Sequence, residues 1–259
     1  MDAVIIAAGY GSRLASLSPS KPLTPVAGVP LIEIGARQCQ TAGVTRIVVV
    51  TGHEAEAVED FLADCSIRLG LPIVPVRIDD WSHPNGWSVI TGAAACAGPF
   101  LLLMADHMFD AAILAHLADQ GHADRDVTLA IDRRIDNPLV DPDDATWVRT
   151  DAEGRITAIG KTIETFDAVD CGAFWATPAL ADAIRSAIAA GKSGSLSDGM
   201  QVLADRGRAA TMEVAGAWWM DVDDPHAHAL VEAEAPQRIP GAFAALCGDA
   251  RPEIKDISA

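Results

Sequence analysis

Three features are absent from this sequence: a long apolar run, an excess of basic residues and closely paired cysteines. No apolar segment approaches the roughly 20 residues that a membrane-spanning helix requires, so we expect no membrane segment. The amino-terminal stretch MDAVIIAAGYGSRL has no cationic residues ahead of its apolar ones and does not predict a signal peptide. We therefore expect a cytoplasmic protein.

The balance of charge is strongly acidic. The 259 residues include 19 lysines and arginines against 36 aspartates and glutamates, which gives a net charge of −17. A general nucleic-acid-binding protein presents a basic face, so this composition argues against a nucleic-acid partner. It does not argue against an enzyme of phosphorylated metabolites, in which a few clustered cations and a bound metal ion set the local field.

The cysteines are five in number, and no two of them form a CxxC pair. An odd count among apolar or small neighbours indicates reduced thiols in a reducing compartment and argues against a zinc site. They are Cys39, Cys65, Cys96, Cys171 and Cys247.

The first half of the chain alternates short apolar runs with helical patterns. Strands are expected at 3–8, 46–51, 73–78 and 100–104, and helices at 30–42, 55–62 and 87–97. Apolar strands that alternate with helices are typical of a parallel sheet covered on both faces. We predict an α/β protein with a doubly wound, mostly parallel sheet of Rossmann-like type.

The second half is richer in strands and less regular. Strands are expected at 127–131, 146–150, 156–159, 169–175 and 209–214. Three helices are expected: one at 178–190, one that begins at an N-cap at Ser197, and one at 225–235. This pattern predicts a small β-rich region added to the sheet. We expect one continuous domain at 1–235 and a tail at 236–259 whose structure the sequence does not assign.

A loop rich in glycine and basic residues, AAGYGSRLASLSPSKPL, follows the first expected strand. Gly9 and Gly11 allow the main chain to turn sharply, and successive amides there can bind an anion. Arg13 and Lys21 add positive charge to the same loop. The alternative is an ordinary turn with two surface cations.

Two other phosphate-binding loops do not fit this segment. The P-loop pattern GxxxxGK[ST] is absent. A dinucleotide-binding loop requires a third glycine, where this chain has Leu14, and an acidic residue at the end of the second strand, which reads Thr51-Gly52-His53. A nicotinamide-dependent oxidoreductase is therefore disfavoured.

Acidic residues follow the fourth strand and recur in the late segment WWMDVDDP. Asp106 is expected at the carboxyl edge of the sheet, where ligands bind in such folds. Asp221 and Asp223 are two apart on an extended segment and point the same way, while Asp224 fits an N-cap ahead of Pro225. Mg²⁺ prefers oxygen ligands and takes one or two carboxylates together with substrate phosphates, an arrangement that Asp106 and Asp223 can supply.

The loop resembles the signature AAGxGxRL … KP[LM] of nucleotidyltransferases that activate sugar and alcohol phosphates. The resemblance implies that Arg13 and Lys21 bind triphosphate oxygens and that Asp106 and Asp223 hold Mg²⁺. The loop residues that it assigns to the nucleotide are Ala8, Gly9, Gly11, Ser12, Arg13 and Lys21, with Asp106. At Asp224 the family more often has threonine.

A narrower resemblance is carried by the segment IGKTIETFDAVDCGAF, which is similar to IGKxxxxYDAVDTGxF of cytidylyltransferases that act on myo-inositol 1-phosphate. It implies that Lys161 binds the acceptor phosphate or the α-phosphate. The stretch Asn85-Gly86-Trp87-Ser88 is similar to one that lies near the base in CTP-using members, which assigns Asn85 and Ser88 to the nucleotide. Weaker candidates for acceptor binding are His107, Asp136, Asn137, Asp170 and Asp221.

The function implied by this resemblance is transfer of a cytidylyl group from CTP to the phosphomonoester of a small alcohol, myo-inositol 1-phosphate, with Mg²⁺ as cofactor. Phosphocholine, 2-aminoethylphosphonate, or a sugar 1-phosphate with another nucleotide remain alternatives, as does a homologue that only binds nucleotide. A choline-type acceptor would require an aromatic cage, which six tryptophans leave open. In some relatives this enzyme is fused to a membrane-bound CDP-alcohol phosphotransferase, so such an enzyme is the expected downstream partner.

Overall fold

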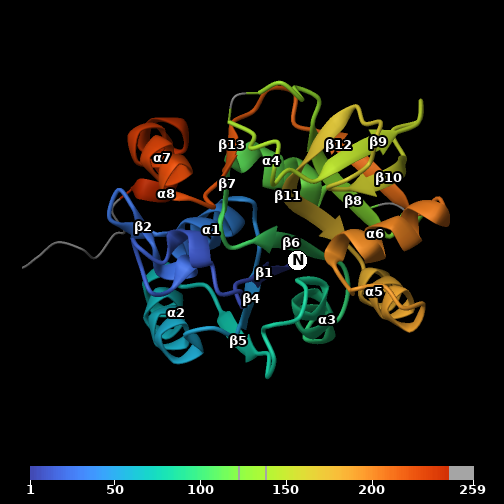
Figure 1. Ribbon diagram of the computed structural model, residues 1–259. Helices are drawn as coiled ribbons and strands as arrows, with labels where there is room; N and C mark the ends of the chain where they lie inside the picture. Colours follow the sequence, from blue (N-terminus) through green and yellow to red (C-terminus); the bar gives the residue numbers. More distant parts are fainter. Residues whose placement is uncertain (122, 138, 245–259) are drawn as a thin grey trace, which may run out of the picture.

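A nine-stranded mixed sheet forms the centre of the computed structural model, which describes residues 1–121, 123–137 and 139–244 (Figure 1). Its parallel half contains, in spatial order, β6 (Phe100–Met104), β1 (Asp2–Ile6), β4 (Arg46–Thr51) and β5 (Ile73–Arg77). These are the four strands predicted from apolar runs, and β4 and β6 have the predicted bounds. The α/β, Rossmann-like class is confirmed.

The other half of the sheet is the predicted β-rich region. In it β11 (Ala168–Ala176) lies antiparallel to β6, β8 (Val127–Asp132) and β9 (Trp147–Thr150). The edges are formed by β10 (Ile156–Gly160) and by β12 (Ala209–Glu213), which is parallel to β8. Two small antiparallel pairs, β2 (Pro25–Val26) with β3 (Val29–Pro30) and β7 (His107–Phe109) with β13 (Trp219–Asp221), lie off this sheet.

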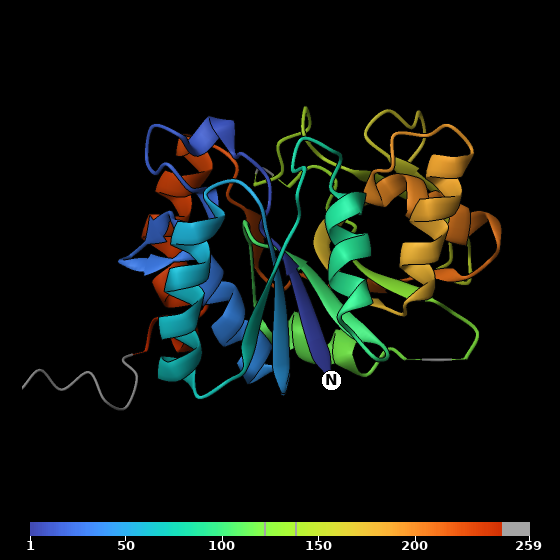
Figure 2. The same cartoon turned by 90° about the horizontal axis from the view of Figure 1, so that it is seen from below.

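Helices cover both faces of the sheet, as Figure 2 shows. One face carries α1 (Leu31–Thr41), α2 (Ala55–Leu69) and α4 (Ala111–Ala118), and the other carries α3 (Gly86–Ala94), α5 (Ala179–Ala189) and α6 (Leu196–Asp205). Alternate residues of each strand supply the two apolar cores because side chains of a strand point to opposite faces. In β1, for example, Ile5 packs with α1 and α2 while Val4 packs with α3.

A third apolar cluster joins the start of the chain to its carboxyl-terminal helices, α7 (Pro225–Arg238) and α8 (Pro240–Phe243). Leu14 of the glycine loop, Met108 of β7 and Val231 of α7 are buried in it. Ile239 and Ala242 belong to the same cluster, so residues 236–244 of the expected tail pack against the rest of the chain. The remainder of that tail, with Cys247, lies outside the described residues. The predicted N-cap is confirmed, since Asp224 accepts a hydrogen bond from the Ala227 amide.

Some local predictions were wrong. The helix expected to end at Leu62 continues to Leu69 and ends at Gly70, whose φ of 60° suits a helix C-cap. The cap of α6 is Ser195, not Ser197, because Ser195 and Asp198 form a reciprocal capping box. The short strands β7 and β13, and helix α4, were not anticipated. Among the described residues, no helix combines the length and the apolar character needed to cross a bilayer.

A buried acidic residue holds α1 to its neighbours. Glu33 is 4% exposed and accepts hydrogen bonds from Arg37, at 2.6 and 3.0 Å, and from Arg68, at 2.5 Å. We expect Glu33→Ala to lower the free energy of unfolding by about 3–5 kcal/mol, because it leaves two arginines without their buried partner. Urea denaturation measures this change, and Glu234→Ala, at an exposed pair with Arg238, is the control. A loss at Glu33 as small as that at Glu234 would contradict the prediction.

Candidate active site

The glycine loop turns at the carboxyl end of β1 and runs into two short 3-10 turns, at Ser12–Leu14 and Lys21–Leu23. Gly11 has a φ of 63°, in the left-handed region that favours glycine. A Cβ there would also lie 2.8 Å from Cδ of Lys21. The absence of a side chain at Gly11 therefore lets the Lys21 side chain cross the loop toward the edge of the sheet.

Lys21 joins two carboxylates from distant parts of the chain. Its Nζ lies 2.5 Å from Oδ2 of Asp106, at the end of β6, and also pairs with Oδ1 of Asp223, which is 202 residues away in sequence. All three side chains are largely buried, at 13, 23 and 18% exposed respectively. The two aspartates predicted to hold a metal ion are thus brought together, with an ammonium group between them.

Arg13 and Lys161 meet a carboxylate that the sequence did not identify. Arg13 donates to Asp144 at 2.8 Å and to Asp223 at 2.7 Å, and Lys161 pairs with the other oxygen of Asp144. Asp144 lies in the β8–β9 connection, where no strand end or motif distinguishes it from neighbouring aspartates. It brings the cation of the glycine loop and the cation at the end of β10 to one point.

His107 and Asp221 lie on the paired strands β7 and β13. His107 Nδ1 is 2.8 Å from Oδ1 of Asp106 and 3.7 Å from Oδ1 of Asp221. The ring packs closely against Gly172, whose φ is 78° and where a Cβ would lie 2.6 Å from Nε2 of His107. Glycine is therefore required at this position of β11 if His107 is to face the site.

The pKa values of these groups reflect crowding of negative charge. Burial would raise the pKa of Asp106, but the charge of Lys21 and the hydrogen bond with His107 outweigh it and hold that pKa well below its usual range. Burial lowers the pKa of His107, but Asp221 and Asp106 raise it to about 9. Burial, together with Asp106 and Asp223, raises the pKa of Asp221 to about 8. Burial and a hydrogen bond to Asp144 also raise the pKa of Asp223.

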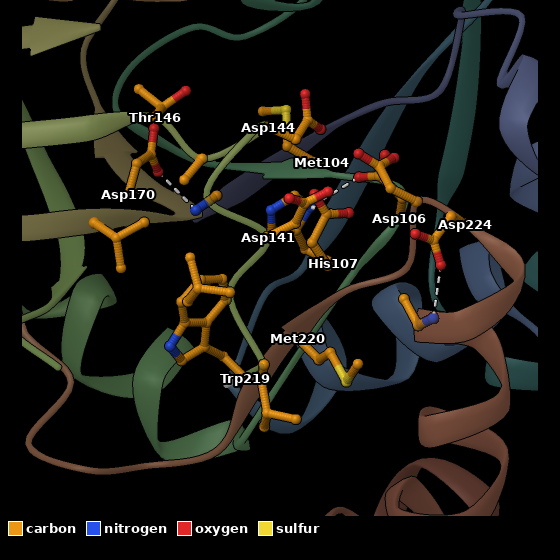
Figure 3. Close-up of a pocket in the computed structure, with 18 of the residues that line it drawn as sticks. Met104, Asp106, His107, Asp141, Asp144, Thr146, Asp170, Trp219, Met220 and Asp224 are labelled. Atoms are coloured by element: carbon orange, nitrogen blue, oxygen red, sulfur yellow. Dashed lines mark hydrogen bonds and ion pairs between the residues drawn. The ribbon is translucent and has the colours of Figure 1, made fainter. Parts of the chain in front are cut away.

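These groups border a cavity of about 580 Å³ between the carboxyl end of the sheet and α7. Figure 3 shows Asp170 and Thr146 on one side of it and Asp106 and Asp224 on the other. Its predicted lining residues are Arg13, Asn85, Asp106, His107, Lys161, Asp170, Asp221 and Asp223. Lining residues that the sequence analysis missed include Asp141, Asp144, Thr146 and Trp219.

Other predicted site residues have different positions. Ser88 is 8% exposed in α3, and neither Ser88 nor Asp136 is among the described residues that line the cavity. Asn85 lines it, while its Oδ1 accepts a hydrogen bond from the Leu196 amide at 2.9 Å and so fixes the start of α6. Asn137 accepts a hydrogen bond from the Leu139 amide. The backbone of Ala8 accepts a hydrogen bond from the His53 amide.

The residues present fit a divalent cation. Ligand atoms of Asp106, His107 and Asp221, and those of Asp144, Asp221 and Asp223, lie within 4.8 Å of one another in two groups. Asp221 is common to both groups, and its Oδ1 is buried and has no hydrogen-bond partner in the part of the chain that the structure describes. Carboxylate oxygens are the ligands that Mg²⁺ prefers. The sequence made Asp221 only a weak candidate for the site. In the structure it is the one residue shared by both candidate ligand groups, whereas Asp106 and Asp223 each belong to one.

Asp170 supplies a test of the electrostatics that is independent of the metal. Burial raises its pKa from 3.8 to about 6, although the Gly172 amide and His107 act in the opposite direction. The folded protein then binds more protons than the unfolded one, so this contribution to stability is present below pH 4 and is lost as the pH rises through 6. We expect Asp170→Asn to match the wild type closely at pH 4 and to exceed its free energy of unfolding by about 3 kcal/mol at pH 8. Urea denaturation at both pH values measures the difference, and equal stabilities at pH 8 would refute it.

Comparison with known proteins shows the family to which this chain belongs. Residues 3–196 match the MobA-like NTP transferase domain family. A "Bifunctional IPC transferase and DIPP synthase" of Rubrobacter xylanophilus is 34% identical over 228 residues, which cover 87% of this chain and 50% of that protein. A protein of the same description from Aquifex aeolicus is 32% identical over 229 residues, covering 86% and 49%. The chain thus spans about half the length of these curated relatives.

Solved structures share the fold at lower sequence identity. The inositol-1-phosphate CTP transferase from T. maritima superposes with a TM-score of 0.79 at 22% identity, covering 91% of this chain and 96% of that one. A UDP-glucose pyrophosphorylase complexed with UDP-glucose gives a TM-score of 0.73 at 18% identity, covering 89% and 96%. The family model matches three quarters of the chain, and that part includes the glycine loop of the site. The chain therefore belongs to the MobA-like NTP transferase domain family.

Proposed function

We propose that this protein transfers a cytidylyl group from CTP to the phosphate of a small alcohol, myo-inositol 1-phosphate, and releases pyrophosphate. The observation that carries the proposal is the convergence of Arg13 and Lys161 with Asp106 and Asp223 at one cavity, where Lys21 pairs with both of these aspartates. The choice of CTP and inositol phosphate is supported by the descriptions of the relatives, which name an IPC transferase and an inositol-1-phosphate CTP transferase.

In this reaction an oxygen of the acceptor phosphate attacks the α-phosphorus of CTP. The new P–O bond forms as the bond between the α-phosphorus and the bridging oxygen of pyrophosphate breaks. A phosphate monoester has a second pKa near 6 and is largely dianionic at pH 7, so no general base is needed to create the nucleophile. The protein has to bring two polyanions together and stabilise charge on the leaving group, which positioning and electrostatics achieve.

The cations of the site have separate roles in the proposal. Arg13 and Lys21 bind the β- and γ-phosphates as pyrophosphate departs, and the amides of the glycine loop contribute further donors. Lys161 reduces the repulsion between the acceptor and the α-phosphate. Phosphate oxygens would replace Asp144 and Asp223 as partners of Arg13 and Lys161, whose side chains are 49 and 56% exposed and therefore reachable.

Mg²⁺ is proposed as the cofactor, held by Asp106 and Asp223 with Asp221 beside them. When bound, it neutralises charge on the phosphates and on the leaving pyrophosphate. Since the Lys21 ammonium pairs with both Asp106 and Asp223, Lys21 has to exchange at least one carboxylate for a phosphate oxygen when nucleotide and cation bind together.

The acceptor is proposed to occupy the side of the cavity formed by Thr146, Asp170 and Trp219 (Figure 3). Asp170 lines the cavity, and its Oδ1 accepts a hydrogen bond from the Gly172 amide at 2.7 Å. A carboxylate and a threonine hydroxyl suit the hydroxyl groups of a polyol. The product would be consumed by a CDP-alcohol phosphotransferase, the partner expected from the sequence.

The decisive experiment is a panel of nucleoside triphosphates against phosphorylated acceptors, read by pyrophosphate release. The acceptors are myo-inositol 1-phosphate, phosphocholine, 2-aminoethylphosphonate and glucose 1-phosphate. We expect the highest kcat/KM for CTP with myo-inositol 1-phosphate. Turnover with another pair would reassign the substrate, and tight binding of CTP without turnover of any acceptor would favour a regulatory nucleotide-binding protein.

Removal of divalent cations is expected to abolish pyrophosphate release. EDTA in excess of the metal should reduce the rate to background, and added MgCl₂ should restore it, because the phosphates would otherwise lack a counter-charge at Asp106 and Asp223. Circular dichroism after EDTA treatment serves as the control for folding. Full activity of the metal-stripped protein in EDTA would contradict the proposed cofactor.

A further inference from the structure

Three aromatic side chains from separate parts of the chain meet beside the glycine loop, and none of them lines the cavity described above. Tyr10 lies between Gly9 and Gly11, His53 follows β4, and Trp81 lies in the connection between β5 and α3. Tyr10 is 50% exposed and Trp81 is 42% exposed. We call Tyr10, His53 and Trp81 the aromatic platform.

The platform is held together by ring packing. The rings of Tyr10 and Trp81 are nearly parallel, with an angle of 20° and centroids 6.1 Å apart. His53 stands edge-on to both, with its centroid 4.6 Å from that of Tyr10 and 5.2 Å from that of Trp81. Nδ1 of His53 is buried and has no hydrogen-bond partner among the described residues, so this ring is fixed by packing, while Tyr10 and Trp81 stay about half exposed.

The platform is also fixed to the strand end from which the glycine loop starts. The His53 amide donates to the carbonyl oxygen of Ala8 at 3.0 Å. A Cβ at Gly52 would lie 2.8 Å from that same oxygen and from Cβ of Trp81. The absence of a side chain at Gly52 therefore lets both Ala8 and Trp81 pack closely against it. Trp81 shares the β5–α3 connection with Asn85, which lines the cavity, and Tyr10 belongs to the glycine loop, so the platform adjoins two parts of the proposed nucleotide site.

The chemistry of this surface favours a flat ligand over a cation. A quaternary ammonium group needs several ring faces around it, each within about 6 Å, and rings 6.1 Å apart leave no room for one between Tyr10 and Trp81. An aromatic heterocycle needs only one open face on which to stack. The adjoining loop has the glycines and cations that suit a triphosphate, and a nucleotide carries such a heterocycle on the same molecule as its phosphates.

We propose that the aromatic platform is the stacking surface for the base of the nucleoside triphosphate, with Trp81 as the principal ring. The inference rests on the proposed function, because it requires that the glycine loop hold the phosphates of the same molecule. Every base has a π-face, so stacking contributes affinity with little discrimination between bases. Selection of one base is then left to polar groups elsewhere in the site.

The test measures the binding of CTP, UTP, phosphocholine and inorganic tripolyphosphate by titration calorimetry. The variants are Trp81→Ala, Trp81→Phe and a surface control, Ile67→Ala, whose side chain is 80% exposed on α2. We expect Trp81→Ala to weaken CTP and UTP in parallel by about 5- to 100-fold. Trp81→Phe should retain most of the affinity, Ile67→Ala all of it, and tripolyphosphate should bind all four proteins equally.

Three results would overturn the inference while leaving the proposed function intact. Unchanged CTP affinity in Trp81→Ala would remove the stacking role. An equal loss of tripolyphosphate affinity would show that Trp81 acts through the shape of the glycine loop. If Trp81→Ala weakened phosphocholine but not CTP, the platform would belong to a cationic alcohol, and the inference would also fall. A wild-type protein that binds no nucleotide would overturn the proposed function itself, and the inference with it.

Discussion

Asp106→Asn is expected to lower the rate of pyrophosphate release by about 100-fold or more while the protein remains folded. The carboxylate is paired with Lys21 at 2.5 Å and with His107 at 2.8 Å, at the end of β6. Asparagine keeps the size and the hydrogen-bonding oxygen but removes the negative charge that would attract a divalent cation and orient Lys21. Loss of one such electrostatic contact commonly costs 10²- to 10³-fold in rate.

The measurement is kcat with saturating CTP, Mg²⁺ and the preferred acceptor. The control is Asp182→Asn, which removes the same charge from a side chain 74% exposed on α5 and should leave kcat unchanged. Thermal unfolding of both variants verifies that they fold. Wild-type kcat in folded Asp106→Asn would eliminate the metal role assigned to this carboxylate.

Lys21→Ala is expected to reduce both turnover and stability. The sequence alone suggests an effect on turnover, since Lys21 belongs to the glycine loop. The structure adds that its ammonium neutralises two partly buried carboxylates, Asp106 and Asp223. Removing one partner of a buried ionic cluster leaves uncompensated charge at a cost of about 3 kcal/mol. We therefore expect that loss in the free energy of unfolding, together with a fall in kcat of about 100-fold.

A second variant separates the two effects. In Lys21→Ala with Asp223→Asn, one of the unpaired charges is gone, so most of the lost stability should return while turnover stays low. Stability is measured by urea denaturation at pH 7 without divalent cations, and turnover by pyrophosphate release. If the double variant were no more stable than Lys21→Ala, charge repulsion would not be the cause of the loss.

The parallel half of the sheet could be predicted because its signals are local. Apolar runs such as those at β4 and β6 identify strands that are buried on both faces. The glycine loop was recognisable for the same reason, since Gly9, Gly11, Arg13 and Lys21 lie close together in sequence. The N-cap at Asp224 needed only its own side chain and the Pro225 that follows.

At the site, the features that the sequence did not reveal lack a local signal. The strands β7 and β13 are three residues each, too short for an alternating pattern, and they exist because they pair with each other across the chain. Asp144 is one of several aspartates in its loop. Nothing in sequence distinguishes it from Asp141 or Asp143, whereas in the structure it pairs with Arg13 and Lys161.

The sequence by itself determined the family, the α/β architecture and the residues of the phosphate-binding loop, because each depends on neighbours within a few positions. Only the tertiary structure decided which carboxylates meet these cations. Asp106, Asp144 and Asp223 belong to three segments that approach one another only when the sheet, the β8–β9 connection and the strand before α7 are assembled. Other features also belong to that assembly, because each requires atoms from separate segments of the chain. They are the crowding of carboxylates, the close approach of side chains to Gly11 and Gly172, and the stacking of Tyr10 on Trp81.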